Sequence, residues 1–213
     1  MVFKESALAR VKSGEVRQAI LDSAAKQIAM SSYMDTTVAK IAKGAGIVPS
    51  NVYIYFDSKL QIYLEIYGQW LQEQMEMLDS RVARARTPRT RVQRLVHGLL
   101  VDIVDDATGY TSALMEGLAV VQAKDHYSPD LLLWTEARII QIISTSLDGY
   151  DSDDPRLRAA VHLLMLTFDG MAMRMKALRS FNQHDPVMPE VERAMVDLLL
   201  SCRWSGRAPS QKK

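Results

Sequence analysis

A tight turn of small residues between two short helical patterns constrains this chain more than any other feature. Residues 38–42 place apolar side chains at helical spacing, and Pro49 suits the first position of a second helix. Between them, Gly44 and Gly46 permit the left-handed backbone and the close helix approach that a tight turn needs. The spacing therefore predicts a helix-turn-helix, whose second helix is short enough to lie in a DNA major groove.

The second helix of this motif has one apolar face and one polar face. Val52 and Phe56 are four residues apart and are expected to point into the core. The residues left for the outer face, and therefore for DNA, are Ser50, Asn51, Tyr53 and Ile54.

Matching positions at fixed spacing run well beyond the turn itself. They comprise Arg17, Ile20-Leu21, Ala24-Ala25, Thr36-Thr37-Val38, Ile41-Ala42, Ala45-Gly46-Ile47, Tyr53-Ile54-Tyr55-Phe56 and Ser58-Lys59. With these positions, residues 16–66 resemble the DNA-binding domain of TetR-family transcriptional regulators. Two departures are that residues 31–35 lack the usual glycine and that Val48 stands where a serine often caps the recognition helix. The lost cap costs about 1 kcal/mol.

The resemblance implies an all-α protein. It would have an N-terminal three-helix DNA-binding domain, followed by a helical bundle for effector binding and dimerisation. We place the DNA-binding domain at residues 14–60 and the ligand-binding and dimerisation domain at residues 61–205. Residues 1–13 and 206–213 are expected to be flexible ends.

Charge is distributed unevenly along the 213 residues, although the net charge is only +1. Residues 1–60 carry 8 Lys/Arg and 5 Asp/Glu, so the remainder is slightly acidic. A modestly basic head suits DNA contact by a dimer, in which that charge doubles. A single cysteine excludes an intramolecular disulfide framework. Because the sequence shows no signal peptide and no membrane-length apolar run, we expect a cytoplasmic protein without membrane contact.

Helical patterns continue through the rest of the chain, with no alternating strand pattern. The expected helices cover residues 16–30, 57–79, 92–104, 111–122 and 130–147, and the last of these is apolar on nearly every side. Two further helices carry repeats of 3.5 residues: Leu157, Val161, Leu164, Phe168, Met171, Met175 and Leu178, then Met188, Val191, Met195, Leu198 and Cys202.

Small side chains beside the first of these stripes would let a partner helix approach closely. We therefore expect a homodimer interface formed by Ala160, Thr167, Gly170, Ala177, Val191, Met195, Leu198 and Cys202. The resemblance also implies an interface on the last two long helices, and a two-fold operator calls for a dimer. The alternative is that both stripes belong to the core of a monomer.

Candidate DNA-binding residues are Thr36, Thr37, Lys43, Ser50, Asn51, Tyr53, Tyr55 and Lys59. Asn51 is the candidate for reading a base edge, because asparagine can bind adenine through two hydrogen bonds. Ser50 is assigned to bases or phosphates, and Tyr53, Tyr55 and Lys59 to phosphates. Alternatively, the tyrosines only stabilise the domain, and this alternative applies best to Tyr55.

Six arginines crowd residues 81–94, either as an anion-binding patch or as a solvated junction paired with Asp102, Asp105 and Asp106. The four histidines lie at no metal-ligand spacing, and no nucleophile is paired with a base. We therefore expect no enzyme, no metal and no cofactor.

An effector pocket between the body helices is expected to combine aromatic walls with a few polar anchors. Candidates are Trp70, His97, Tyr110, Met115, Gln122, Trp134, Arg138, Phe168 and Asp169, although each also suits an ordinary core. The sequence thus predicts a homodimeric regulator, functioning as a repressor, that leaves a palindromic double-stranded DNA operator when a small molecule of unknown identity binds. The alternative is a helical ligand-sequestering protein that is not regulated by DNA release.

Overall fold

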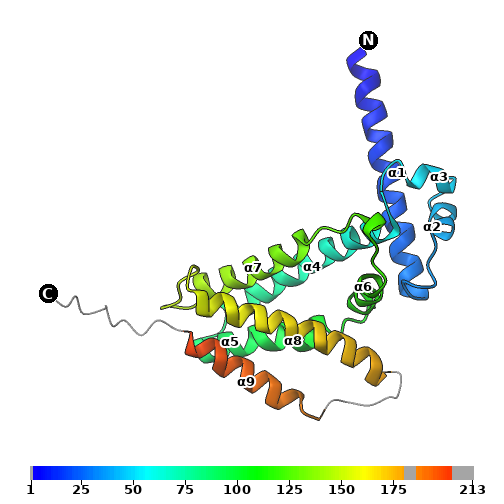
Figure 1. The fold of residues 1–213 in the computed structure, drawn as a ribbon. Coiled ribbons are helices and arrows are strands. Elements are labelled where there is room, and N and C mark those ends of the chain that lie inside the picture. The colour runs from blue at the N-terminus through cyan, green and yellow to red at the C-terminus, as the bar shows by residue number, and fades with distance from the viewer. Residues whose placement is uncertain (1, 180–185, 203–213) are drawn as a thin grey trace. The chain divides into compact units, whose positions relative to one another are not determined.

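The computed structural model of the chain describes residues 2–179 and 186–202, and within these ranges it is helical without strands (Figure 1). This agrees with the predicted all-α fold class. The helices are α1 (Val2–Met30), α2 (Val38–Gly44), α3 (Pro49–Val52), α4 (Lys59–Ala83), α5 (Pro88–His97), the π-helix η1 (Gly98–Ile103), α6 (Tyr110–Ala119), the 3₁₀-helix η2 (Ala123–Asp125), α7 (Asp130–Ser146), α8 (Pro155–Arg179) and α9 (Met188–Ser201).

Several helix ends differ from the predicted ones. The first helix begins at Val2, in the segment expected to be flexible, and the last flexible segment, 206–213, lies outside the described residues. The helix expected from Val92 begins at Pro88, because the Thr87 side chain caps it by accepting a hydrogen bond from the Thr90 amide. In α7, Leu133 is 57% exposed, so that helix is not apolar and buried on every side.

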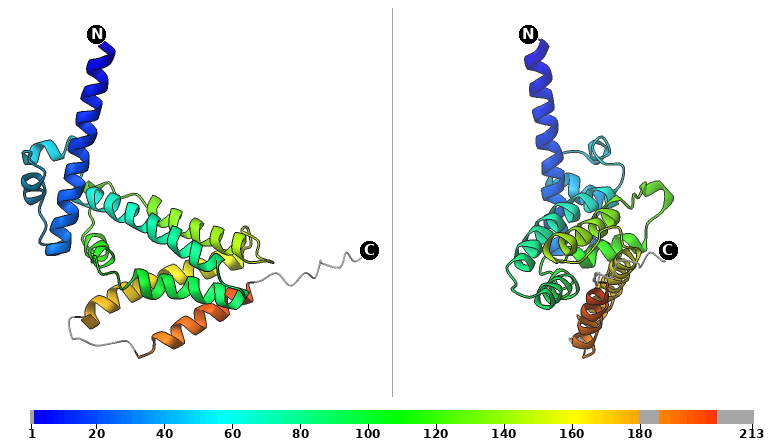
Figure 2. Two further views of the ribbon diagram at one scale, coloured as in Figure 1. Left: turned by 180° about the vertical axis from the view of Figure 1, so that it is seen from behind. Right: turned by 90° about the vertical axis from the view of Figure 1, so that its left-hand side faces the viewer.

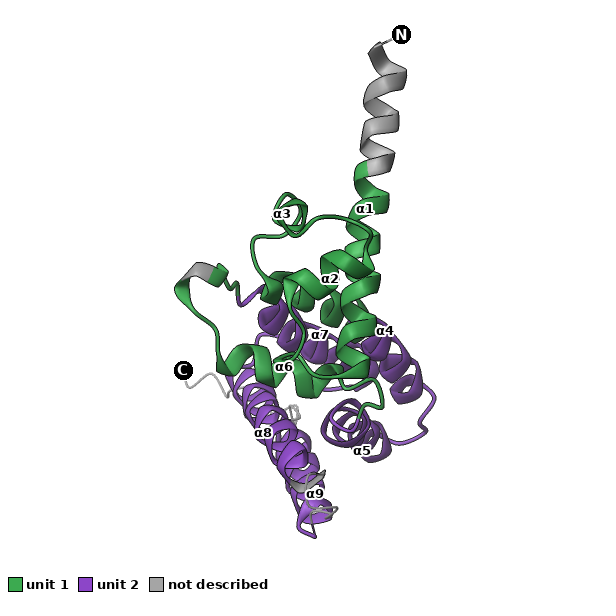
Figure 3. Ribbon diagram, turned by 90° about the vertical axis from the view of Figure 1, so that its right-hand side faces the viewer, with its two compact units in different colours: residues 1–71, 106–128 green, residues 72–105, 129–213 purple. Residues whose placement is uncertain are grey.

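The chain folds into two compact units (Figure 3). Unit 1 comprises residues 1–71 and 106–128, and unit 2 comprises residues 72–105 and 129–213. This division differs from the expected boundary at residue 60, since α6 belongs with the helix-turn-helix and α4 contributes to both units.

The core of unit 1 is built from α1, the helix-turn-helix and the first turns of α4. In α1, Ile20 and Ala24 lie one turn apart and are buried together with Ile41 from α2. Val52, Phe56, Ile62 and Ile66 complete this cluster from the segments that follow. The packing holds α2 against α1 and α3 against α2, as the views in Figures 1 and 2 show.

Helix α6 belongs to unit 1 because hydrogen bonds join both of its ends to that unit. The Asp106 carboxylate accepts hydrogen bonds from the amides of Tyr110 (3.0 Å) and Thr111 (2.9 Å), which starts the helix. The Tyr63 hydroxyl donates to the Tyr110 carbonyl, and the Met34 amide donates to the Glu116 carboxylate at 3.1 Å. The loop before α2 is therefore joined directly to α6.

Unit 2 is a helical bundle in which α5 lies against α9, α7 against α8, and α8 against α9. Met75, Leu78 and Val82 from the second half of α4 are buried in it. The backbone of α5 widens into the π-helix at Gly98, where an added Cβ would meet Leu78 Cδ1 at 2.4 Å. A side chain at position 98 would therefore require the Leu78 side chain to move.

Candidate functional site

The two glycines of the helix-turn-helix serve different physical needs. Gly44 lies against α1, where an added Cβ would stand 2.2 Å from Ser23 Oγ. That hydroxyl is buried and donates to the Ile41 carbonyl at 2.8 Å, which ties α1 to α2. Gly46 has φ +72°, a left-handed conformation that side chains disfavour. The turn therefore holds the start of α3 at a set position beside α2.

The recognition segment has the two faces that its sequence predicts, although α3 itself ends at Val52 and residues 53–55 form a turn. Val52 and Phe56 are buried, while Ser50 and Asn51 are exposed. Tyr53 and Ile54 are 56% and 73% exposed, and Tyr55 is half-buried against the core. The N-cap residue Val48 forms no side-chain cap hydrogen bond, as its sequence requires.

Ile54 is the residue of this face that the candidate DNA-binding set lacks. Its exposure leaves an apolar side chain beside Asn51 and Tyr53 on the outer surface. Exposed apolar side chains on a recognition helix can contact the methyl group of thymine. Its outward position was predictable, but apolar character alone did not mark it as a contact.

The two threonines before α2 have separate positions. Thr37 is exposed and caps α2, since its hydroxyl accepts a hydrogen bond from the Lys40 amide at 3.2 Å. Thr36 is only 1% exposed, and its hydroxyl donates to the Ser32 carbonyl at 2.7 Å. The hydroxyl of Thr36 is thus used inside the domain, in contrast to the predicted DNA contact. Lys43 is exposed in the last turn of α2.

Lys59 also differs from its expected role as a phosphate contact. Its ammonium donates to the carbonyls of Tyr33 (2.8 Å) and Thr36 (2.9 Å) and lies 3.9 Å from the centre of the Tyr33 ring. Burial lowers the pKa of this lysine, although Glu116 and Asp125 act in the opposite direction. The ammonium group therefore does not face outward. It holds the loop before α2 against the start of α4 and so positions α2.

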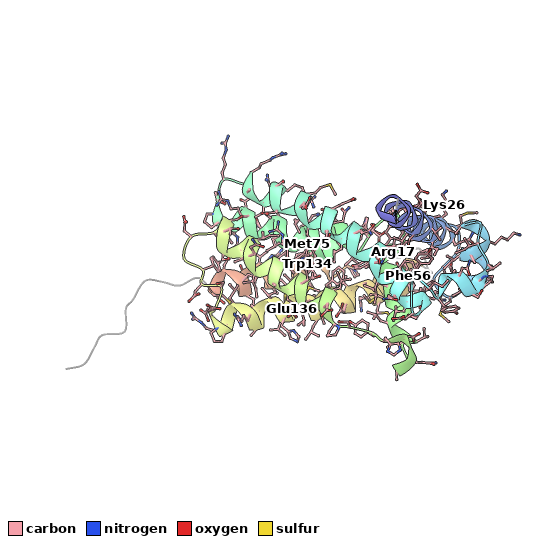
Figure 4. The ribbon with its side chains drawn as sticks, turned by 90° about the horizontal axis from the view of Figure 1, so that it is seen from above. Arg17, Lys26, Phe56, Met75, Trp134 and Glu136 are labelled. Carbon is pink, nitrogen blue, oxygen red and sulfur yellow. The ribbon has the colours of Figure 1, made fainter. Side chains whose placement is uncertain are left out.

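Arg17 fastens α1 to α4 beside the recognition helix. Its guanidinium forms an ion pair with Glu65, which raises the pKa of Arg17, and lies 4.7 Å from the centre of the Phe56 ring. Arg17 and Phe56 are both labelled in Figure 4. Phe56, the aromatic residue at the end of the recognition segment, is therefore in contact with Arg17 of α1.

Four of the candidate effector-binding residues fall in unit 1. Trp70 packs edge-on against Tyr110, with ring centroids 5.9 Å apart, and also contacts Tyr67. Met115 is buried, whereas Gln122 is exposed and caps the short helix η2. The structure thus brings Trp70 and Tyr110 together and leaves Gln122 outside that aromatic group.

The other five candidates fall in unit 2. Arg138 is paired with Asp79 at 2.8 Å, Phe168 is 5% exposed in the core, and Trp134 is half-buried. Asp169 is half-buried, and desolvation raises the pKa of its carboxyl, with His162 acting in the opposite direction. His97 is exposed, and its Nδ1 lies 2.9 Å from the Glu192 carboxylate. The Asp169 carboxylate forms no hydrogen bond within the part of the chain that the structure describes.

The candidate interface residues divide between the surface and the core of unit 2. Gly170 and Ala177 are exposed, while Thr167, Val191, Met195 and Leu198 are half-buried. Ala160 and Cys202 are 2% and 5% exposed, so both belong to the core of unit 2. This differs from the interface role expected of Ala160, whereas burial is the common state of a lone free cysteine such as Cys202. The Cys202 thiol lies 3.5 Å from the Leu198 carbonyl, and burial raises its pKa.

A second apolar stripe on α8 faces outward, and the sequence analysis did not separate it from the first. Leu163, Leu166 and Met173 are 47%, 53% and 51% exposed. Together with Gly170 and Ala177 they step along the helix by three and four residues. We call these five residues the outer stripe of α8. The sequence predicted the small residues Gly170 and Ala177 on this face, but only burial showed that Leu163, Leu166 and Met173 lie outward with them.

Comparison with known proteins places the helix-turn-helix in a described family. Residues 20–66 match the profile of "Bacterial regulatory proteins, tetR family". A transcriptional regulator of Brucella anthropi, the HTH-type regulator BetI, is 31% identical over 80 residues, which is 38% of this chain and 41% of that protein. The matched segment therefore spans about two-fifths of the length of that relative.

Solved structures resemble the chain over most of its length. A putative transcriptional regulator from Rhodococcus sp. RHA1 superposes with a TM-score of 0.64 at 14% identity, covering 87% of this chain and 95% of that one. The regulator FadR from Bacillus subtilis, solved with stearoyl-CoA, has a TM-score of 0.56 at 18% identity, covering 87% and 98%. At these identities the likeness concerns the fold.

None of the helices in the described part of the chain has the length and apolar character that a membrane-spanning helix needs.

Proposed function

We propose, from the premise that this chain belongs to the TetR family of bacterial regulatory proteins, that it is a ligand-responsive transcriptional regulator which binds double-stranded DNA. The observation that carries the proposal is the exposed face of α3. Its outward side chains stand on a short helix that buried Val52 and the glycine turn hold in place. An exposed short helix continued by the exposed turn residues Tyr53 and Ile54 suits the major groove.

Asn51 is the proposed base-reading residue, because its exposed amide can donate to and accept from one base edge. Ser50 is assigned to bases or phosphates, Tyr53 to phosphate, and Ile54 to a thymine methyl group. Lys43 and the capped start of α2 at Thr37 supply phosphate contacts. Tyr55, Lys59 and Thr36 support this surface from inside the domain.

A homodimer completes the proposed DNA reader. The outer stripe of α8 presents apolar side chains that a monomer would leave in water, with Gly170 at its centre, where no atom lies within 4 Å of an added Cβ. The half-buried Val191, Met195 and Leu198 of the neighbouring α9 extend this surface. Two copies related by a two-fold axis would present their recognition helices to a palindromic operator, about 34 Å apart.

Effector control is the third part of the proposal, and the likeness to FadR, solved with stearoyl-CoA, supports a fold that can hold a small molecule. Release from DNA would follow from a conformer in which α4 moves and the two recognition helices no longer match successive major grooves. Because α6 is hydrogen-bonded to the loop before α2, a shift of α6 would reach the same surface. A coupling free energy of roughly 1–3 kcal/mol would change DNA affinity about 5- to 150-fold. We assign the protein to repression and to the cytoplasm, where the DNA lies.

One measurement of DNA binding distinguishes a transcriptional regulator from the alternative, a ligand-sequestering protein. Fluorescence anisotropy with the intergenic DNA beside the protein's own gene should show tight binding by the wild type. The double variant Asn51→Ala, Tyr53→Ala should abolish it, and Gln141→Ala, an exposed change on α7, should have no effect. Equal affinity for that DNA and for scrambled DNA, unchanged in the double variant, would favour the alternative.

A further inference from the structure

We propose that unit 2 carries a binding site for a small phosphate-bearing molecule in the groove between α5 and α9. This inference does not rest on the proposed transcriptional function, because it concerns residues of unit 2 alone. It assigns a role to the arginine-rich segment 81–94, for which the sequence allowed either an anion-binding patch or a solvated junction.

The groove has the size of a small-molecule site. Its volume is about 530 Å³, and it lies where α5 packs against α9, with Arg81 of α4 and Asp102 of the π-helix at its side. Ligand pockets usually measure about 300–1,000 Å³. Side chains from four separate segments therefore converge on a hollow large enough for a nucleotide-sized molecule.

Positive charge dominates the lining. Four arginines face the groove, namely Arg81, Arg89, Arg94 and Arg193, against the two carboxylates Asp102 and Glu192. Two of these arginines are neutralised, because Arg81 pairs with Asp102 at 2.7 Å and Arg89 with Asp197 at 3.1 Å. The remaining two come from opposite walls, Arg94 from α5 and Arg193 from α9.

Arg94 and Arg193 have no carboxylate partner among the residues that the structure describes. Arg94 donates to the Arg81 carbonyl at 2.7 Å, which fixes its guanidinium at the groove and leaves most of its N–H groups for another acceptor. Arg193 is exposed and forms no ion pair within the described residues. Guanidinium groups in this state suit phosphate oxygens, which they can bind through two parallel hydrogen bonds.

The carboxylates of the groove are already engaged. His97 lies between them, with Nδ1 at 2.9 Å from Glu192 and Nε2 at 3.7 Å from Asp102. Both acids therefore have partners other than Arg94 and Arg193. Asp102 reaches its position through the π-helix, a type of local widening that is frequent at functional sites.

A small molecule fits this lining better than a nucleic-acid backbone does. The surface is concave, and two acidic side chains line it, so an extended row of phosphates would meet like charge. A single phosphate or diphosphate group needs only Arg94 and Arg193, and the Glu192 carboxylate is already held by His97. Two guanidinium groups without a carboxylate partner, one on each helix, favour an anion with at least two charges.

Isothermal titration with inorganic pyrophosphate tests the site in the full-length protein. We expect saturable binding of one pyrophosphate per chain in about 0.15 M salt, where diffuse surface attraction is largely screened. Arg193→Gln and Arg94→Gln should each weaken it at least about tenfold, the usual effect of losing a charge-assisted hydrogen bond. Arg84→Gln, an exposed arginine of the same segment outside the groove, is the matched control and should change affinity less than about twofold.

Arg193→Gln removes no contact within the described residues, so its fold should be intact even if Arg94→Gln is destabilised. No saturable binding by the wild type, or an equal loss in Arg84→Gln, would overturn the proposal. Citrate binding more tightly than pyrophosphate would overturn the assignment to phosphate. If a short random DNA duplex displaced pyrophosphate and Arg193→Gln weakened both, the groove would belong to nucleic acid instead.

Discussion

At the scale of single residues, position along the recognition segment decides which side chains can contact DNA and which pack into the core of the domain. Asn51 on α3 and Tyr53 just after it are both exposed, whereas Tyr55, two residues further on, is half-buried against the core. A side-chain amide can distinguish bases, but a phenolic hydroxyl that contacts phosphate cannot. The two exposed residues should therefore give different signatures when they are removed.

Asn51→Ala should relax the preference at one base position of the operator, by about 1–3 kcal/mol for a contact made through two hydrogen bonds. Tyr53→Phe should weaken binding to every sequence by a similar factor and leave the preference unchanged. Selection of operators from a randomised pool, followed by affinity measurement, distinguishes the two. An unchanged selected motif for Asn51→Ala would remove the base-reading role.

The position of Lys59 in the sequence suggests a contact with DNA, but its side chain is partly buried and its ammonium faces the interior of the domain. Its ammonium is satisfied by two backbone carbonyls and the Tyr33 ring. Lys59→Met should therefore lower the free energy of unfolding, by about 1–3 kcal/mol for buried acceptors left without a donor. It should leave the salt dependence of DNA affinity unchanged.

Exposed Lys43 is the matched comparison for this prediction. Lys43→Ala should leave thermal stability nearly unchanged and flatten the slope of log affinity against log salt by about one unit, as the loss of a phosphate contact does. Thermal unfolding and salt titrations measure both quantities. The opposite pattern, with a flattened slope only in Lys59→Met, would restore Lys59 to the DNA surface.

At the scale of elements, the helix-turn-helix depends on how closely α2 approaches α1. The Cα of Gly44 faces Ser23, whose hydroxyl bonds to the Ile41 carbonyl. Gly44→Ala would force the Ser23 side chain away and break that bond. We expect a loss of about 1–3 kcal/mol, typical of overpacking, and weaker DNA binding.

Gly14→Ala provides the control, since nothing lies within 4 Å of a Cβ at that exposed position of α1. There the substitution should raise stability by about 0.5–1 kcal/mol, because alanine loses less backbone entropy in a helix than glycine does. Denaturant unfolding curves compare the two variants. Equal stabilisation by both would show that α1 and α2 do not meet as closely as Gly44 indicates.

At the scale of the whole molecule, assembly is expected to depend on the outer stripe of α8. Gly170→Arg would place a long charged side chain at its centre, facing outward, without emptying the core of unit 2. The variant should remain helical by circular dichroism and sediment as a monomer. Its affinity for a palindromic operator should fall, because one recognition helix then binds alone.

Ala137→Arg, an exposed position on α7, is the matched control for added charge and bulk. It should sediment as the wild type does. A folded Gly170→Arg protein that sediments as an unchanged dimer would move the interface to another surface. A wild type that sediments as a monomer at micromolar concentration would contradict dimerisation through this stripe.

The sequence by itself determined the helix-turn-helix, its two-faced second helix and the all-α class. These follow from local signals, namely glycine conformations, helical spacing and apolar periodicity, which act between residues a few positions apart. It also identified one heptad pattern in α8 and one in α9. The spacing alone did not show whether each pattern faces the core or the surface, because apolar residues at this spacing line one face of a helix in either case. Only the tertiary structure decided that Ala160 and Cys202 are buried and that Leu163 and Leu166 face outward. It alone turned Lys59 inward and placed Arg94 and Arg193 on the lining of one groove, because both arrangements depend on segments far apart in the chain.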